Sequence, residues 1–301
     1  MRILRAEHLG MCFGVRDAIA LALKKSERGP LTILGDLVHN EVVLAALRAR
    51  GIRIAQEPGA VGTHEVMITA HGASETSIGR VRGIGHHVVE ATCPLVRVAH
   101  RAVLQLARDG FHPVIIGKRD HVEVRGLTGD LVSFDVVLTE AEVFELKEHP
   151  CFGVAAQTTQ PIDRVQYLVG LIRWRFPNSE VRFVDTVCRP TKQRQQAAIE
   201  LARQSDVVLV IGGAHSNNTH ELVKTCGRHC EHVYHVQTVD DLRAEWFAGA
   251  CSVGVTAGTS TPDAVVNAVE EWLGRYAANS PAPTAPPVDG QLHPVGECGT
   301  A

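Results

Sequence analysis

The sequence predicts an α/β protein of three pseudo-threefold-related lobes, each with a small parallel sheet, around a central cavity. Two observations predict this fold: a similar unit occurs three times, and short apolar runs alternate with helical patterns. In each copy, a cysteine precedes a helical stretch and an apolar run that ends in glycine 23, 24 and 24 residues later. The three pairs are Cys12 with Gly35, Cys93 with Gly117, and Cys188 with Gly212.

The apolar runs are short and apolar at both odd and even positions, which is typical of strands buried on both faces of a sheet. They lie at residues 31–35, 66–70, 113–117, 152–156, 207–213 and 252–258. Between them, apolar residues at three- and four-residue spacing predict helices at 18–25, 101–110, 196–204 and 263–275. This alternation predicts βαβ units, in which ligands bind at loops beyond the carboxyl ends of the strands.

The repeat divides the chain into lobes at 1–92, 93–187 and 188–276. Residues 277–301 are rich in Pro, Ala and Gly without a period, which predicts a disordered tail. If rotation about one axis relates the lobes, their carboxyl edges face a shared cavity with the cysteines on its floor. A linear array of α/β units is the alternative, although three units are few for a solenoid.

Composition excludes several classes of protein. A formal net charge of −3 provides no basic field for nucleic acid. No apolar run approaches the ~20 residues of a membrane span, and the N-terminus lacks the apolar region of a signal peptide. The eight cysteines do not form the close pairs of a small secreted domain, so reduced thiols or metal ligands are expected. We therefore expect a cytoplasmic protein without a nucleic-acid or membrane partner.

The three repeat cysteines suit either a zinc site with one more ligand or an iron–sulfur cluster with one iron that has no protein ligand. Structural zinc usually draws on a close CxxC pair, and none is present among these three, so the spacing favours the cluster. Buried cysteines often act only as small apolar side chains. Their shared offset within the repeat argues against that interpretation.

Polar side chains recur in the predicted βα loops of all three copies. Four positions beyond the glycines lie His39, His121 and Ser216, and six positions beyond lie Glu41, Glu123 and Asn218. Asn217 lies between two of these residues, and the second apolar run of each copy leads to His71, Thr158 or Ser260. Imidazole, hydroxyl and amide donors near helix N-termini suit phosphate oxygens, so a local anion site is expected.

Nine motifs, in order over about residues 1–275, resemble the LytB/IspH family of 4-hydroxy-3-methylbut-2-enyl diphosphate reductases. They are GMCFGV, LVHN, HGAS, ATCPLV, HVEVRG, QTT, DTVCRPTKQRQ, SNNT and AGTSTPD. The resemblance implies a trefoil of three lobes that closes over the substrate. It also implies one [4Fe-4S] cluster with one open iron and three ligands, Cys12, Cys93 and Cys188.

The resemblance further implies removal of the allylic hydroxyl of the substrate, which gives isopentenyl and dimethylallyl diphosphates in the non-mevalonate isoprenoid pathway. Ferredoxin or flavodoxin is the implied electron donor, since no flavin or nicotinamide fingerprint is present. The resemblance also implies that Glu123, near Thr158, is the proton source and that both residues are catalytic. The residues implied to hold the diphosphate are His39, His71, His121, Thr158, Ser216, Asn217, Asn218 and Ser260.

Four positions depart from the family pattern: Val122 replaces a proline, Arg125 a second carboxylate, Asn217 a serine, and Ala73 the valine of HGVS. Two alternatives stay open at this point. One is a paralogous [4Fe-4S] enzyme acting on another diphosphate, and the other is a non-catalytic iron–sulfur sensor.

Overall fold

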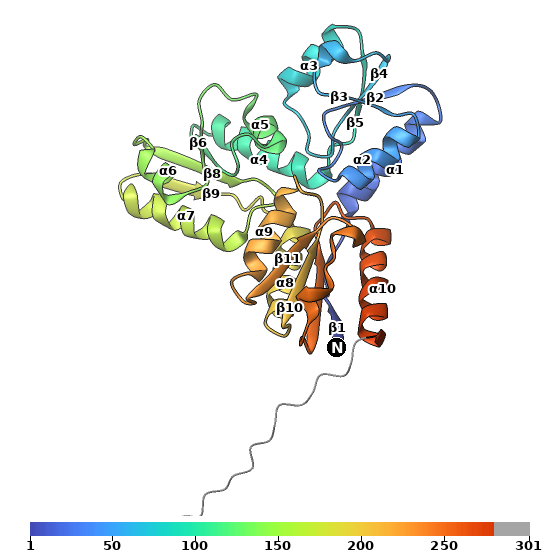
Figure 1. Ribbon diagram of the computed structural model, residues 1–301. Coiled ribbons are helices and arrows are strands. Elements are labelled where there is room, and N and C mark those ends of the chain that lie inside the picture. The colour runs from blue at the N-terminus through green and yellow to red at the C-terminus, as the bar shows by residue number, and fades with distance from the viewer. Residues whose placement is uncertain (280–301) are drawn as a thin grey trace, which may run out of the picture.

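The computed structural model describes residues 1–279, which fold into three lobes around a common centre (Figure 1). Each lobe contains a four-stranded parallel sheet flanked by helices. This arrangement confirms the α/β trefoil expected from the repeat. Within residues 1–279, no helix combines the length and apolar character needed to cross a membrane.

The first sheet has the strand order β3-β2-β4-β5. Its strands are β2 (Leu31–Leu34), β3 (Arg53–Ala55), β4 (Glu65–Ile68) and β5 (His87–Glu90). The helical segments of this lobe are α1 (Phe13–Ser26), α2 (Glu41–Ala49), the short η1 (Pro58–Ala60) and α3 (Glu75–Gly83).

The second sheet repeats this topology with the order β7-β6-β8-β9. Its strands are β6 (His112–Ile116), β7 (Asp135–Val137), β8 (Cys151–Ala156) and β9 (Glu180–Phe183). Its helices are α4 (Pro94–Arg108), α5 (Val122–Thr128), α6 (Glu140–Glu145) and α7 (Ile162–Arg175).

The third sheet has the order β11-β10-β12-β1, so the N-terminal strand completes it. Its strands are β1 (Arg2–Arg5), β10 (Val207–Ile211), β11 (His232–Val236) and β12 (Ser252–Ala257). Its helical segments are α8 (Arg189–Ala202), α9 (Asn217–Cys226), η2 (Val239–Asp241), η3 (Ala244–Phe247) and α10 (Asp263–Asn279).

Two lobe limits expected from the sequence differ from the sheets. Residues 2–5 were expected in lobe one, but Ile3 pairs with Val253 of β12. The tail was expected from residue 277, but α10 continues to Asn279, and residues 280–301 lie outside the described part of the chain. The boundaries at 92/93 and 187/188 stay predictions of where domains divide.

Apolar side chains fill both faces of each sheet. In the third sheet, Leu209 and Val255 lie in a cluster with α10, whereas Val208 and Val210 lie in a second cluster with α8. Every residue of β10 and β12 is buried, as the runs apolar at both parities predicted. Helices therefore cover both faces of the sheet. A ligand can approach the sheet only where its strands end.

Close contacts join each lobe to the next. A Cβ at Gly14 of lobe one would lie 2.5 Å from the Cys93 sulfur at the entrance to lobe two. A Cβ at Gly213 of lobe three would lie 2.3 Å from the His39 carbonyl oxygen of lobe one. The Asn217 amide of lobe three donates to the Thr159 hydroxyl of lobe two at 3.3 Å. The three lobes thus form a closed ring rather than a linear array.

We expect Gly213→Ala to weaken this closure, since the new methyl group would overlap the backbone at His39 and Asn40. Overpacking of this kind costs about 1–3 kcal/mol, measured as a lower midpoint of urea unfolding. The control is Gly79→Ala in α3, where no atom lies within 4 Å of the new Cβ. An unchanged midpoint for Gly213→Ala would contradict the close approach.

Candidate functional site

The repeat cysteines lie at equivalent places, each directly before the first residue of a helix. Cys12, Cys93 and Cys188 are the N-cap residues of α1, α4 and α8, and none of their sulfurs caps its helix. Each cysteine N–H donates at 3.0 Å to a carbonyl in the loop after the third strand of a sheet. These carbonyls belong to Thr259, Ala70 and Thr158. One local motif therefore holds all three thiols at the carboxyl edges of the sheets.

Burial raises the pKa of the Cys93 and Cys188 thiols, that of Cys188 to about 11. The negative charges of Cys12 and Glu123 also raise the pKa of both thiols, which means that these four groups lie close to one another. The Cys188 sulfur also lies 3.1 Å from the Thr191 hydroxyl. Thiols in this environment become thiolates when a cation takes the place of the proton.

The three sulfurs do not all lie within 4.8 Å of one another. Four ligands around a single zinc ion lie closer, about 3.8 Å apart for sulfurs at 2.3 Å from the metal. Three half-buried thiols at this wider spacing fit a larger inorganic group capped at three points. The residues present are therefore compatible with an iron–sulfur cluster.

Three histidines, one from lobe two and two from lobe one, form a cluster beside the thiols. The ring centroids of His39 lie 4.5 Å from His71 and 5.2 Å from His121, and those of His71 and His121 are 5.5 Å apart. Burial lowers the pKa of all three, that of His71 well below its usual value and that of His121 to about 3. The imidazoles are therefore neutral near pH 7.

Hydrogen bonds orient the donors of this cluster. The Glu123 N–H donates to Nδ1 of His121 at 3.1 Å, so the neutral ring carries its proton on Nε2. The Asn218 Oδ1 accepts the N–H of Thr259 at 3.0 Å. Among the described residues, Nδ2 of Asn218 and Nδ1 of His71 are buried and find no protein partner. Buried polar groups without partners are costly, and an anionic ligand would satisfy them.

Of the eight residues expected at the anion site, all but Thr158 line one small cavity of about 40 Å³. These are His39, His71, His121, Ser216, Asn217, Asn218 and Ser260. Four other residues of its wall were not expected from the sequence: Val15, Val38, Thr159 and Thr259. Thr159 and Thr259 are the sequence neighbours of Thr158 and Ser260 in hydroxyl-rich loops. This adjacency could have predicted that they line the same cavity.

Glu123 is 1% exposed and lies behind this cavity, against Thr158. Thr158 donates its N–H to Oε1 of Glu123 at 2.6 Å and its hydroxyl to Oε2 at 3.0 Å. Burial raises the pKa of Glu123 to about 7, although both bonds from Thr158 oppose the rise. A carboxyl with this pKa can deliver a proton at neutral pH.

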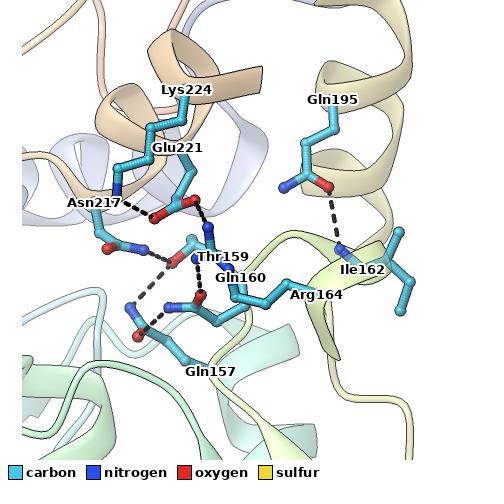
Figure 2. A network of polar contacts seen from close by, with 9 residues as sticks. All are labelled: Gln157, Thr159, Gln160, Ile162, Arg164, Gln195, Asn217, Glu221 and Lys224. Atoms are coloured by element: carbon cyan, nitrogen blue, oxygen red, sulfur yellow. Dashed lines mark hydrogen bonds and ion pairs between the residues drawn. The ribbon is translucent and has the colours of Figure 1, made fainter. Parts of the chain in front are cut away.

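A partly buried network of polar contacts links lobes two and three (Figure 2). Arg164 of α7 pairs with Glu221 of α9 at 3.0 Å and also donates to Gln160 at 3.4 Å. From Gln160 the hydrogen bonds continue through Gln157 to the Thr159 hydroxyl. That hydroxyl also accepts a hydrogen bond from the Asn217 amide. The network therefore positions the start of α9, where the Ser216–Asn218 donors lie.

Two of the departures from the family pattern lie on α5. Val122 is its first residue, and Arg125 is exposed in its last turn. Both line a neighbouring cavity of about 300 Å³ between lobes one and two. The charge of Arg125 contributes to lowering the pKa of His121, after burial and other charges.

A second cluster of potential metal ligands, His112, Asp135 and His149, lies at the opposite edge of the second sheet, where its strands begin. Its two imidazoles stack in parallel, with centroids 3.8 Å apart and planes 3° apart. Ring nitrogen lone pairs lie in the ring planes, so these two do not converge on one point. The cluster is separate from the site.

A family model described as "LytB protein" matches residues 3–274. The chain is 36% identical to the 4-hydroxy-3-methylbut-2-enyl diphosphate reductase of Aquifex aeolicus, over 90% of this chain and 95% of that protein. It is 35% identical to the enzyme of the same name from an Anaeromyxobacter species, over 91% and 97% of the two chains.

Two solved structures are similar. One is a (E)-4-hydroxy-3-methyl-but-2-enyl diphosphate reductase described as the terminal enzyme of the non-mevalonate pathway, with 34% identity and a TM-score of 0.66. It covers 91% of this chain and 100% of that one. The other is a reductase from Plasmodium falciparum, 23% identical, with a TM-score of 0.84 over 91% and 87% of the chains. The second likeness supports the fold alone.

The low pKa of His121 predicts that the site destabilises the protein in acid. Between pH 6.5 and about 3 the unfolded chain binds a proton at this histidine and the folded chain does not, so stability falls as pH falls. The contribution is up to about 1.4 kcal/mol for each pH unit. In His121→Asn, the free energy of unfolding should fall less steeply between pH 7 and 5. The exposed His229→Asn should match the unmodified protein, and equal slopes for all three would contradict the buried neutral imidazole.

Proposed function

Because the chain belongs to the LytB family, we propose that it is an iron–sulfur reductase that converts 4-hydroxy-3-methylbut-2-enyl diphosphate to isopentenyl and dimethylallyl diphosphates. One structural observation supports this proposal independently of the family match. Three thiols, three neutral imidazoles and a carboxyl with a pKa of about 7 converge at the carboxyl edges of three sheets. These are the groups needed to hold a cluster, bind an anion and give a proton.

The diphosphate would bind the donors of the small cavity. Nε2 of His121 and the unpartnered Nδ2 of Asn218 supply N–H groups, and the hydroxyls of Ser216 and Ser260 supply O–H groups. The first turn of α9 adds free backbone N–H groups, which favour phosphate. A bound diphosphate would also raise the pKa of the imidazoles, because a nearby anion favours their charged form.

Cys12, Cys93 and Cys188 would hold a [4Fe-4S] cluster, which supplies electrons one at a time and one iron without a protein ligand. Their thiolates lie at the N-termini of three helices, where partial positive charge favours anions. Glu123 lies close enough to Cys93 and Cys188 to influence both thiols. A substrate hydroxyl between the cluster and the histidines would therefore be within reach of this carboxyl.

Glu123 would give its proton to the hydroxyl oxygen of the substrate. Cleavage of the carbon–oxygen bond takes up two electrons and two protons in total, and the oxygen departs as water. The second proton adds at either end of the allylic group, which accounts for two products. Thr158 holds the Glu123 carboxylate that is left, because its N–H and hydroxyl both point at that group.

Entry of the substrate needs a wider cavity than the one observed. A volume of about 40 Å³ is far below the ~300 Å³ of a small-molecule site. The relative with 34% identity also superposes less well, at a TM-score of 0.66, than the one with 23% identity, at 0.84. A different orientation of the lobes in that structure would account for this reversed order. We infer that the lobes separate to admit substrate.

The electron donor is proposed to be ferredoxin or flavodoxin, and the compartment the cytoplasm. A reducing compartment would keep the three thiols free of disulfides, and all seven cysteines within residues 1–279 are free.

We expect Glu123→Gln to keep the iron and sulfide content and to lose about 100-fold or more of turnover, because the amide has no proton to give. The assay is oxidation of a dithionite-reduced dye on addition of substrate under anaerobic conditions. The matched control is Glu41→Gln, since Glu41 holds the repeat-equivalent position but is exposed and pairs with Arg48. Full activity of Glu123→Gln would remove the proposed proton role.

The pH dependence of turnover tests the carboxyl in another way. Activity should fall as the pH rises above about 7, because Glu123 then loses its proton. In Thr158→Val one hydrogen bond to the carboxylate is lost, which raises the pKa of Glu123 and moves the fall to higher pH. Thr158→Ser keeps the hydroxyl and should keep the original profile. A shift to lower pH in the valine variant would contradict the assignment.

A further inference from the structure

The side chain of Arg194, which the function described above does not use, is buried beside the loop before Cys12 and the helix that follows Cys188. It is 8% exposed and lies on α8. Its Nε and Nη2 donate to the Gly10 carbonyl at 3.0 and 2.7 Å, and its Nη1 donates to the Pro190 carbonyl at 3.1 Å. Gly10 lies two residues before Cys12, and Pro190 two residues after Cys188. The guanidinium thus ties the first turn of α8, just after Cys188, to the loop before Cys12.

This cation has no carboxylate in contact. Within residues 1–279 it forms no ion pair, whereas the neighbouring Arg16 pairs with Asp263. Burial lowers the pKa of Arg194, while Cys12 and Cys188 act to raise it. A buried cation without a counter-ion is costly, so an anionic group is expected beside it. The nearby anionic groups are the thiolates of Cys12 and Cys188 and the cluster that they would hold.

We propose that Arg194 is a positioning residue whose fixed charge stabilises the reduced state of the cluster, while its hydrogen bonds hold the loop before Cys12 against the first turn of α8, which follows Cys188. This inference rests on the proposed cluster. Each electron that enters adds negative charge, and a buried guanidinium attracts that charge more strongly than an exposed one because little water screens it. The cluster is therefore easier to reduce with Arg194 than without it.

The test compares two substitutions that separate charge from hydrogen bonding. Arg194→Gln keeps a neutral donor, and Arg194→Lys keeps the charge. Iron and sulfide content and the midpoint potential of the holoprotein are measured by anaerobic redox titration. Arg194→Gln should lower the equilibrium constant for one-electron reduction about tenfold or more, a shift of about 59 mV. Arg194→Lys should stay close to the unmodified protein in potential.

The control is Arg97→Gln, in the first turn of α4 after Cys93, whose half-exposed side chain pairs with Glu90 and should leave the potential unchanged. A cluster-loaded Arg194→Gln with unchanged potential would overturn the inference. If Arg194→Gln holds no cluster, Arg194→Lys decides: a loaded lysine variant with the original potential supports the role of charge, and loss of iron from both overturns it. Absence of a cluster from the unmodified protein would instead refute the proposed function.

Discussion

One backbone hydrogen bond, made three times, underlies the arrangement of the site. The N–H of each N-cap cysteine donates to a carbonyl that follows the third strand of a sheet, and in two of the three cases that carbonyl belongs to Thr158 or Thr259. A cysteine held in this way lies at the carboxyl edge of its sheet, where helices begin and polar loops gather. Since the histidines and Glu123 follow strands at the same edges, closing the ring brings them to one place.

Exclusion of water then sets the chemistry of these side chains. Burial pushes the pKa of Glu123 up and those of His39, His71 and His121 down. The three imidazoles are therefore neutral near pH 7, and Glu123 keeps its proton up to about that pH. A site lined by neutral donors can accept a doubly charged phosphate without a net basic surface. The bound anion and the cluster together would concentrate negative charge, which the buried Arg194 is placed to offset.

Much of this site could be predicted from the sequence, because it depends on local patterns. The common offset of Cys12, Cys93 and Cys188 and the polar residues after each glycine follow from a repeat that can be counted along the chain. The partner of β1 could not be predicted, since Arg2–Arg5 is a short and largely exposed strand without a marker for its neighbour. Nor could the role of Arg194, because an arginine in a helical pattern is usually solvated and only packing shows it to be buried.

The pairing of β1 with β12 also bears on how the chain folds. Ile3 and its partner Val253 lie far apart in the sequence, with the first two sheets between them. The first two sheets have all their strands within continuous segments and can form during synthesis, whereas the third is complete only once β12 has been made. Contacts so distant in sequence slow folding. The cysteine site needs all three lobes, so it assembles late in folding.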